Sequence, residues 1–482
     1  MKKETGDAPV SRMLLWAIAV LVAARLISLA LYPLMDTTEA RYGDIARRMV
    51  ERSDWITPWF TDKQPFWGKP PLSFWATALG FKLFGINEFA GRLPHLILGI
   101  CVGALTWMYA RHQSSRTAWH AVALLGGTLL FVVSSGAVMT DMSLTLGTTL
   151  VMVGFWMAIR DRVGGTWLGQ SLMALGFIIG LLGKGPLVLV LCAMPIGAWL
   201  LWQRRVVDAW RRIAWLRMLL FVLVFSLPWY ITAEIHTPGF LNYFLVGEHW
   251  QRFVNAGWTG DKYGAAHAFP HGAIWLFELG AIAPWPFLLV PLSLVNRGSQ
   301  NSSSSAEVKD GERLYLLLWG LWPCVFFTLS GNVIWTYVLP GLPALALLAA
   351  LWTSKQSGES TERVLTIGVW ISTATLVVCV ALANKADYLS RSSAKELMTD
   401  YQVQARVTDA LYYFGEVPFS VSFYSDGRAQ HLSRLEDLDS NWPGRTALVA
   451  MSLDQYEALS EETKLRFTEL SRRGPRLLLR WQ

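Results

Sequence analysis

Charged and polar side chains interrupt the long apolar runs of this sequence at a few places, and these residues could carry out chemistry. They are Asp36, Glu39, Arg41 and Lys69 near the start of the chain, Asp141 and Lys184 in two short turns, Glu248, His249, His267 and His271 further on, and Tyr337. A polar group at membrane depth is costly, so by default it suggests function. We take these residues as the candidate site.

Glu248, His249, His267 and His271 have the side chains of a divalent-metal site. Imidazole and carboxylate groups are ligands that suit zinc. Their spacing matches no standard zinc finger, and a surface loop with ordinary histidines fits the same spacing at least as well. A zinc or magnesium site is therefore one of two open interpretations, and we expect no cofactor to be required.

The other candidates also have local interpretations. Glu39 and Arg41 could form an ion pair on a single helix. Lys69 could be an anchor whose charged end reaches the membrane surface. Asp141 could cap the helix that follows it. Lys184 is harder to explain in this way, because glycines flank it in a tight apolar turn that offers few local partners.

Membrane helices are the elements that would position these residues. The 482 residues are 53% hydrophobic and 16% charged, a composition outside the soluble globular class. A membrane span needs about 20 apolar residues. Such spans are predicted near 13–34, 91–110, 118–136, 142–159, 167–183, 186–202, 213–233, 272–294, 314–330, 335–352 and 364–383. The predicted fold class is an α-helical polytopic membrane protein with about eleven or more spans. Arg25, inside the first span, should pair with a buried carboxylate or carbonyl.

The net charge of +7 lies largely in short loops between the spans, for example around Arg111 and Arg204, so we reject nucleic-acid binding. The positive-inside rule places such loops and the N-terminus in the cytoplasm. An odd number of spans then places the C-terminal segment outside. All the candidate residues fall at the outer face in this threading, whereas a transport path would place them on both faces.

Two regions lie beside the spans. Within a membrane domain at 1–384, the first outer loop at 35–90 has helical spacing over 39–52 and 72–84, which predicts two helices along the membrane interface. Residues 385–482 predict a small α/β domain. We expect helices at 395–404 and 454–470, and β-rich runs at 417–424, 446–451 and 476–481.

Several runs, in this order, resemble one family. The first loop reads D-T-T-E-A-R-Y-G-D-I-A-R-R-M at 36–49, then S-D-W-I-T-P-W-F, P-F-W-G-K-P-P-L and F-G-I-N-E-F-A-G-R-L-P; later come V-G-E-H-W-Q-R-F at 246–253, G-D-K-Y-G-A-A-H at 260–267 and T-Y-V-L-P-G-L-P-A-L-A-L-L at 336–348. They resemble bacterial polyprenyl-phosphate-sugar glycosyltransferases of the GT-C fold, which are related to aminoarabinose transferase (ArnT) and, more distantly, to protein O-mannosyltransferases. The C-terminal segment resembles that family's periplasmic α/β domain only in position and size.

The resemblance implies a GT-C enzyme of the bacterial inner membrane, with a periplasmic active site between the first loop and the bundle. A sugar would pass from an undecaprenyl-phosphate carrier to lipid A or lipopolysaccharide, or to another glycan or protein. Asp36 and Glu39 would lie at the transfer centre, with Asp141 as a further carboxylate. The donor phosphate and its lipid would be held by Arg41, Lys69, Lys184 and Tyr337.

The chemistry agrees with this implication. Breaking the bond from sugar C1 to phosphate requires stabilised charge on the leaving phosphate, which Lys and Arg supply. An acceptor hydroxyl would need Asp36 or Glu39 as a base, whereas an ionised lipid A phosphate would not. A lipid or sugar transporter (flippase) is the second hypothesis, and a glycan ligase the third. The one-sided polar residues and the first-loop motif favour the glycosyltransferase.

Overall fold

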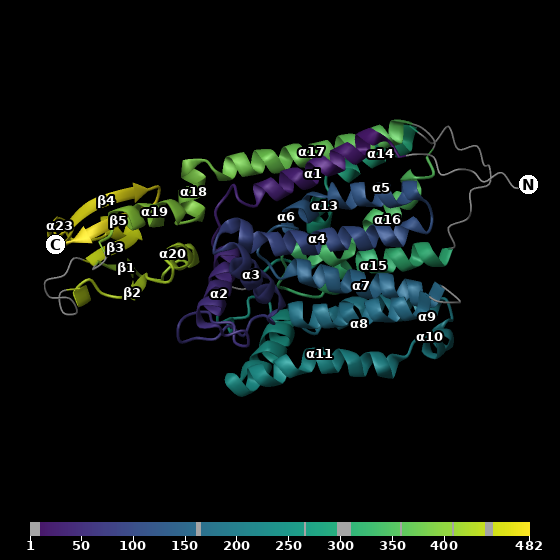
Figure 1. Ribbon diagram of the computed structural model, residues 1–482, viewed down its shortest axis with the longest axis horizontal. Coiled ribbons are helices and arrows are strands. Elements are labelled where there is room, and N and C mark those ends of the chain that lie inside the picture. Colours follow the sequence, from purple (N-terminus) through teal and green to yellow (C-terminus); the bar gives the residue numbers. More distant parts are fainter. Residues whose placement is uncertain are drawn as a thin grey trace, which may run out of the picture.

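The computed structural model describes residues 10–160, 165–264, 267–295, 310–356, 359–406, 409–438 and 447–482. It is a helical bundle with the start of α1 at one end and a sheet domain beyond the other (Figure 1). The bundle consists of α1 (Arg12–Ser28), α4 (Glu88–Arg111), α5 (Ser115–Gly126), α6 (Leu129–Ser134), α7 (Asp141–Arg160), α8 (Gly165–Lys184), α9 (Leu187–Trp202), α10 (Val206–Arg212), α11 (Trp215–His236), α13 (Ala273–Ala281), α14 (Trp285–Val295), α15 (Asp310–Phe327), the 3-10 helix η3 (Trp335–Gly341), α16 (Leu342–Thr353) and α17 (Glu359–Ala383).

The described residues contain six helices long and apolar enough to cross a membrane, or seven if α13 and α14, bent by 77°, form one span. The prediction of a multi-pass membrane protein is confirmed, but the count of eleven is not reached by this measure. The remaining predicted spans correspond to shorter or broken helices. At 118–136, for example, the chain is divided into α5 and α6 by Gly126 and Gly127, since glycine disfavours helix continuation.

Helices α7 and α8 form a close antiparallel pair in the middle of the bundle. Almost all of α7 is buried. A Cβ atom on Gly147 would lie 2.8 Å from the carbonyl oxygen of Gly176, and one on Gly154 would lie 2.5 Å from that of Gly169. Small residues allow membrane helices to approach this closely. The pairing brings the start of α7 beside the end of α8, where Asp141 and Lys184 lie.

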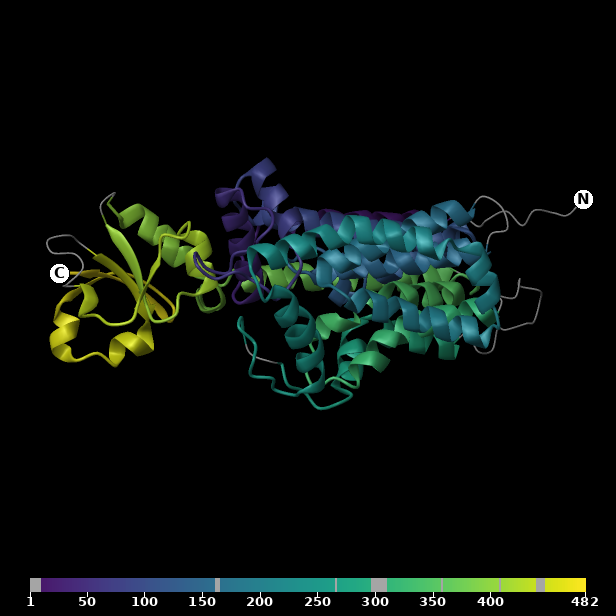
Figure 2. The ribbon, with the colours of Figure 1, turned by 90° about the horizontal axis from the view of Figure 1, so that it is seen from below.

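Two helices of the first outer loop, α2 (Thr38–Arg52) and α3 (Leu72–Phe84), lie between the bundle and the sheet domain (Figure 2). The helices predicted over 39–52 and 72–84 are both present. Their buried apolar side chains, including Ile45 and Phe74, share a core with Phe423 of the C-terminal domain. A π-helix, η1 (Asn242–Gln251), and the short α12 (Arg252–Val254) lie in a second long loop, which joins α11 to α13.

The predicted C-terminal α/β domain is present. Its five-stranded sheet has the order β2-β1-β3-β5-β4, with parallel pairing among β2, β1 and β3 and antiparallel pairing among β3, β5 and β4. The strands are β1 (Ala410–Phe414), β2 (Gln430–Leu432), β3 (Ala447–Ser452), β4 (Phe467–Arg473) and β5 (Arg476–Trp481), and the helices are α18 (Ala386–Ser392), α19 (Lys395–Gln404), α20 (Phe419–Tyr424), α22 (Leu453–Glu457) and α23 (Glu461–Leu465).

Two predictions inside this domain are wrong. The run at 417–424 is helical rather than extended: its aromatic and β-branched residues favour a strand locally, but α20 packs against α2, and tertiary contact decides the outcome. The segment at 454–470 is not one helix. It holds the short helices α22 and α23 and the start of β4.

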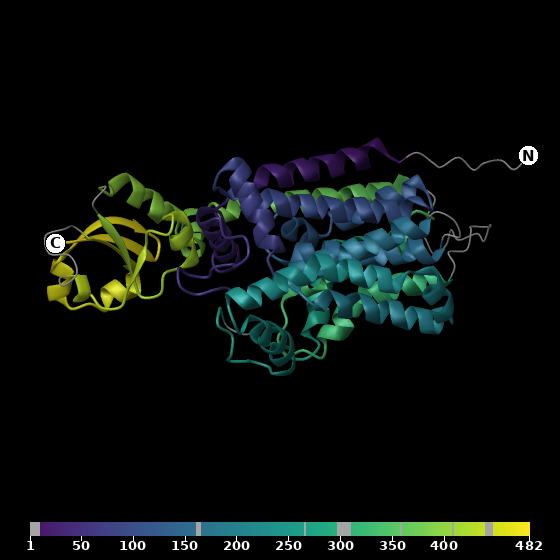
Figure 3. The same cartoon turned by 60° about the horizontal axis from the view of Figure 1, so that its bottom comes forward.

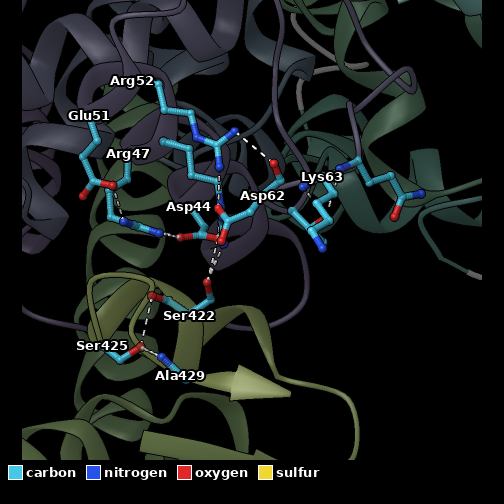
Figure 4. A network of polar contacts seen from close by, with 12 residues as sticks. Asp44, Arg47, Glu51, Arg52, Asp62, Lys63, Ser422, Ser425 and Ala429 are labelled. Carbon is cyan, nitrogen blue, oxygen red and sulfur yellow. Dashed lines mark hydrogen bonds and ion pairs between the residues drawn. The ribbon is translucent and has the colours of Figure 1, made fainter. Parts of the chain in front are cut away.

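A polar network fastens the C-terminal domain to α2 (Figure 4). Ser422 donates a hydrogen bond to the Asp44 carboxylate at 2.9 Å and accepts one from Arg48 at 3.0 Å. Asp44 also binds Arg47, at 2.7 Å, and Arg48 binds Asp62. Because Asp44 and Arg47 are buried, the two domains share a buried polar interface here.

Candidate active site

A buried ion pair joins the neighbouring ends of α7 and α8. Lys184 Nζ lies 2.6 Å from Asp141 Oδ1, and each of the two side chains is 8% exposed. The ring of Tyr337, from η3, faces the same ammonium group, with its centroid 4.7 Å from Nζ. The structure thus brings three of the predicted site residues into direct contact.

The glycines beside Lys184 are required by this packing. Gly185 has a φ of +84°, which favours glycine, and a Cβ atom there would lie 2.5 Å from Phe244 Cζ. A Cβ atom on Gly183 would lie 2.8 Å from Ser143 Cβ. The turn that presents Lys184 can therefore form only with small residues on both sides.

A second charged group lies between the first loop and the second long loop. Lys69 Nζ donates to Glu248 Oε2 at 3.0 Å and to the Gly68 carbonyl at 2.6 Å. Arg252 Nη1 lies 3.2 Å from Glu248 and also 3.2 Å from Asp261. The Glu248 side chain is only 4% exposed, so one buried carboxylate is shared by two cations.

The charges in this group keep each other ionised. Burial alone would raise the pKa of Glu248, but Lys69 and Arg252 outweigh it and hold that pKa below its ordinary value. Burial alone would lower the pKa of Lys69, but Glu248 reverses this and the pKa is raised. Lys69 is therefore a cation fixed by an ion pair, and not the exposed membrane anchor that was one of the interpretations.

The two charged groups are neighbours. His249, which follows Glu248, places a ring nitrogen 3.3 Å from the carbonyl of Lys184, and the ring of Tyr337 lies over the Lys184 ammonium group. Three cations from three parts of the chain, Lys69, Lys184 and Arg252, thus lie close together. Such a set can bind an anion and stabilise negative charge that develops on it.

Two further cations at this end of the bundle have no acidic partner within the described residues. Arg41 donates to the carbonyl of Tyr263 at 2.5 Å and lies 5.1 Å from the ring centroid of Tyr42. Lys262 lies over the ring of Trp67, 4.2 Å from its centroid. Aromatic faces attract a cation but leave its net charge intact. Arg41 and Lys262 therefore add positive charge that no carboxylate offsets.

Asp36 lies at the joint with the C-terminal domain. Its carboxylate accepts hydrogen bonds from the Ser420 backbone N–H, at 2.8 Å, and from the Ser420 hydroxyl, and Arg476 lies 3.7 Å away. Burial raises the pKa of Asp36 against these stabilising contacts. The contacts of Asp36 link the first loop to the C-terminal domain.

Glu39 is paired with Arg92 of α4, at 2.6 and 3.0 Å, and accepts a hydrogen bond from the Val138 N–H at 3.1 Å. Burial would raise its pKa, but Arg92 outweighs burial and the pKa is lowered. Glu39 therefore does not form the local ion pair with Arg41 that was one interpretation. Asp141 is the first residue of α7. Its carboxylate forms an ion pair with Lys184.

The four residues of the possible metal site are engaged separately. Glu248 is held by Lys69 and Arg252. His249 places its ring nitrogens against the carbonyls of Phe244, at 2.8 Å, and Lys184, at 3.3 Å. His271 contacts the carbonyl of Thr328, and the His267 backbone carbonyl accepts from Val333. No group of three or more metal-binding side chains occurs in the parts of the chain that the structure describes.

Sequence reasoning did not single out Arg92, Arg252, Asp261 or Lys262. All four lie inside the runs that resemble the family, so the motifs contained them. Their importance follows from their partners in space, as when Arg92 donates to Glu39 and to three backbone carbonyls near the end of α1. Periodicity and spacing carry no such signal.

Comparison with known proteins agrees with this architecture. Residues 11–244 match the family described as dolichyl-phosphate-mannose-protein mannosyltransferase. The undecaprenyl phosphate-alpha-4-amino-4-deoxy-L-arabinose arabinosyl transferase of Erwinia tasmaniensis is 32% identical over 353 residues, which cover 70% of this chain and 58% of the relative. Transferase 1 of the same description from Pseudomonas fluorescens is 30% identical over 385 residues, 76% of this chain and 63% of the relative. The chain therefore matches about three fifths of the length of these relatives.

The fold has a close counterpart among solved structures. The crystal structure of ArnT from Cupriavidus metallidurans bound to undecaprenyl phosphate superposes with a TM-score of 0.79, at 18% identity and with 97% of each chain covered. The fold is therefore that of this ArnT, a polytopic helical membrane bundle with a small sheet domain. The chain is also similar in sequence to the arabinosyl transferases, and the resemblance predicted from the first-loop motif is confirmed.

Proposed function

We propose that the protein is a glycosyltransferase that moves a sugar from an undecaprenyl-phosphate carrier to an acceptor, with lipid A or lipopolysaccharide favoured. The observation that carries the proposal is the grouping of Lys69, Arg252 and Lys184 in neighbouring ion pairs, which His249 links, with Arg41 and Lys262 nearby. The names of the arabinosyl transferase relatives, and the undecaprenyl phosphate bound to the solved ArnT, support this choice of donor.

The balance of charge suits a leaving phosphate. The five cations face three carboxylates, Glu248, Asp261 and Asp141, so two positive charges remain. A sugar–phosphate–lipid diester has a single negative charge, whereas the lipid monophosphate released from it approaches two. The site therefore stabilises the product phosphate, and the transition state that resembles it, more than the intact donor.

The carboxylates favour an acceptor that is already ionised. Asp141 is paired with Lys184, and Arg92 lowers the pKa of Glu39 against the effect of burial, which makes Glu39 a weak base. Asp36 is bonded to Ser420. An acceptor hydroxyl would need a free base, whereas a phosphate group of lipid A would attack without one. Glu39 and Asp36 then act by holding the first loop in position, with Asp141 positioning Lys184.

We further propose that the shorter bundle helices also cross the inner membrane, which gives about eleven spans in all. The N-terminus is then cytoplasmic, and the site and the C-terminal domain are periplasmic. Basic residues such as Arg111 support this orientation. So does the start of α1, which lies at the end of the bundle away from α2 and the sheet domain (Figure 1).

A transfer assay tests the proposal. Membranes that contain the protein receive an undecaprenyl-phosphate sugar with a radiolabelled sugar, together with lipid A. We expect label to move to lipid A, and Lys69→Ala to reduce the rate by about 10²-fold or more, because a charge at the leaving phosphate is lost. Lys63→Ala is the matched control, since Lys63 is an exposed lysine of the same loop. Absence of transfer by the wild-type protein to lipid, glycan or protein acceptors would refute the enzyme.

A further inference from the structure

An apolar cavity of about 480 Å³ lies among α1, α4, α5, α6 and α17, in the interior of the membrane bundle. Its wall includes Leu21, Trp107 and Trp119. Val22 and Ile100, which also line it, are 42% and 50% exposed, so the cavity opens between α1 and α4 toward the side of the bundle. Helix α1 lies at the edge of the bundle (Figure 3), where bilayer lipid would surround it.

Arg25 is the one charged residue in the wall of this cavity, and it is 3% exposed. Its Nη1 donates to the hydroxyls of Ser28 and Tyr32, and its Nη2 donates to the carbonyl of Val133 at 2.9 Å. Arg25 was predicted to pair with a buried carboxylate or carbonyl, and it pairs with a carbonyl that is partly buried. All these partners are neutral, however.

The charge of Arg25 has no counter-ion among the described residues. Burial would raise the pKa of Glu39, Arg92 outweighs that effect, and Arg25 adds a smaller effect in the same direction as Arg92. The ion pair of Glu39, however, is with Arg92. The Nε–H group of Arg25 is buried and has no hydrogen-bond partner in the described parts of the chain. A buried cation with an unmet donor at membrane depth is costly unless an anion reaches it.

We propose that this cavity binds one hydrocarbon chain of an anionic phospholipid, with the phosphate of that lipid at Arg25. The apolar wall matches the chain, and the uncompensated guanidinium matches the phosphate, for which arginine is well suited. From Leu96 to Trp107 along α4 the cavity extends about 16 Å, close to half of the ~30 Å hydrocarbon core, which is the length of a chain from one leaflet.

The cavity adjoins the candidate active site without belonging to it. Ser135 lines the cavity, and the chain from Ser135 leads to Asp141, which holds Lys184. Between them, Val138 donates to Glu39. A bound lipid would therefore support the segment on which both of these contacts depend. The proposal stands apart from the sugar transfer and holds whatever the donor sugar is.

Gly103 offers a direct test. It lies in the cavity wall, and a Cβ atom there would meet no atom within 4 Å, so the side chain of Gly103→Leu would begin in open space and take up part of the cavity. Gly197 of α9 has equally open surroundings and does not line the cavity, which makes Gly197→Leu the matched control. Both changes place the same side chain at a helical glycine.

The probe is phosphatidylglycerol with a photoreactive diazirine in its chain, in nanodiscs of phosphatidylcholine that contain the full-length protein. After illumination, mass spectrometry locates the labelled peptides. We expect label on α1 and α4, reduced about tenfold by Gly103→Leu and unchanged by Gly197→Leu. The same diazirine on phosphatidylcholine should label these helices weakly, and Arg25→Gln should lower phosphatidylglycerol labelling to that level.

Two results would overturn the proposal: labelling by phosphatidylcholine as strong as by phosphatidylglycerol, or labelling of Gly103→Leu equal to that of the wild type. Thermal unfolding of each variant shows whether it is folded. If Arg25→Gln does not fold, Gly103→Leu and the comparison of the two lipids still decide the outcome.

Discussion

At the Lys184–Asp141 pair, substitutions can separate an effect on stability from an effect on transfer activity. We expect Lys184→Met and Asp141→Leu each to destabilise the protein by about 3–5 kcal/mol, because each leaves one buried charge unpaired. The double variant should regain most of that stability, since no charge remains. Transfer activity should stay lost in all three. Thermal unfolding in detergent and the transfer assay measure the two effects.

Recovery of activity in the double variant would show that the pair only supports packing. Conversely, full stability in either single variant would mean that Lys184 and Asp141 are not coupled as their 2.6 Å separation indicates. A control is Arg363→Met, since Arg363 forms an exposed pair with Glu359 on one helix, and such pairs contribute little.

The Lys69–Glu248 pair predicts a pH window for stability. The pKa of Glu248 is lowered because Lys69 and Arg252 outweigh burial, so its contribution is complete above its ordinary value of 4.5 and is lost as the pH falls through the folded value. The pKa of Lys69 is raised because Glu248 outweighs burial. Its contribution is therefore complete below its ordinary value of 10.5 and is lost as the pH rises through the folded value.

The difference in melting temperature between the wild type and Glu248→Gln should thus be constant from pH 4.5 to 10.5 and shrink outside that window. Melting curves of both proteins across this range make the comparison. Glu462→Gln, at an exposed position in α23, should show no such window. A stability difference that fell steadily through neutral pH would contradict the assignment.

At this scale the sequence predicted the residue types of the site but not their pairing. Lys69 and Lys184 stood out because charge is rare in apolar surroundings. Their partners lie 179 and 43 residues away, and spacing along the chain carries no information about such neighbours. Glu39 stood out in the first loop for the same reason, but its pairing with Arg92 on another helix could not be predicted.

At the scale of elements, the glycine contacts of α7 and α8 set the position of the site. We expect Gly147→Leu to destabilise the protein by about 1–3 kcal/mol or more, because its side chain would meet the backbone of Gly176 and Gly180. Transfer should fall with stability, since Asp141 would move away from Lys184. At Gly197 a Cβ atom would meet no neighbour within 4 Å, so Gly197→Leu should leave melting temperature and activity unchanged.

If Gly147→Leu melted like the wild type, the two helices would have to be further apart than described. Unchanged activity in a destabilised variant would instead show that the spacing of Asp141 and Lys184 is not limiting for transfer.

Hydrophobic runs predicted where the helices lie, and helical spacing predicted both interface helices of the first loop. The runs did not show where helices break. Apolar residues indicate that a segment avoids water. Whether its helix is continuous depends on local features such as Gly126-Gly127 and on the neighbours that bend α13 against α14. The same limit applies to α20, whose residues favour a strand until α2 packs against them.

For the whole molecule, the C-terminal domain forms part of the wall around the candidate site. Phe419, at the start of α20, lies 5.7 Å from the guanidinium of Arg41 and packs against Phe60. We expect Phe419→Ala to lower transfer by about 10-fold, mainly through KM, because Arg41 loses an aromatic neighbour that fixes its position. The domain should remain folded, which the melting curve would show.

Tyr388→Ala is the control, since Tyr388 is exposed on α18 of the same domain and should leave the rate unchanged. Equal activity of Phe419→Ala and the wild type would restrict the domain to a structural role.

The contact between Ser420 and Asp36 spans 384 residues of sequence, and that between Tyr424 and Leu34 spans 390. During synthesis the first loop would leave the translocation machinery long before α20 exists. Asp36 therefore cannot contact Ser420 until every intervening helix has been made. Contacts of such long range form late. Assembly of the candidate site is thereby tied to completion of the final domain, and a chain halted inside the bundle would lack these contacts however well its helices had packed.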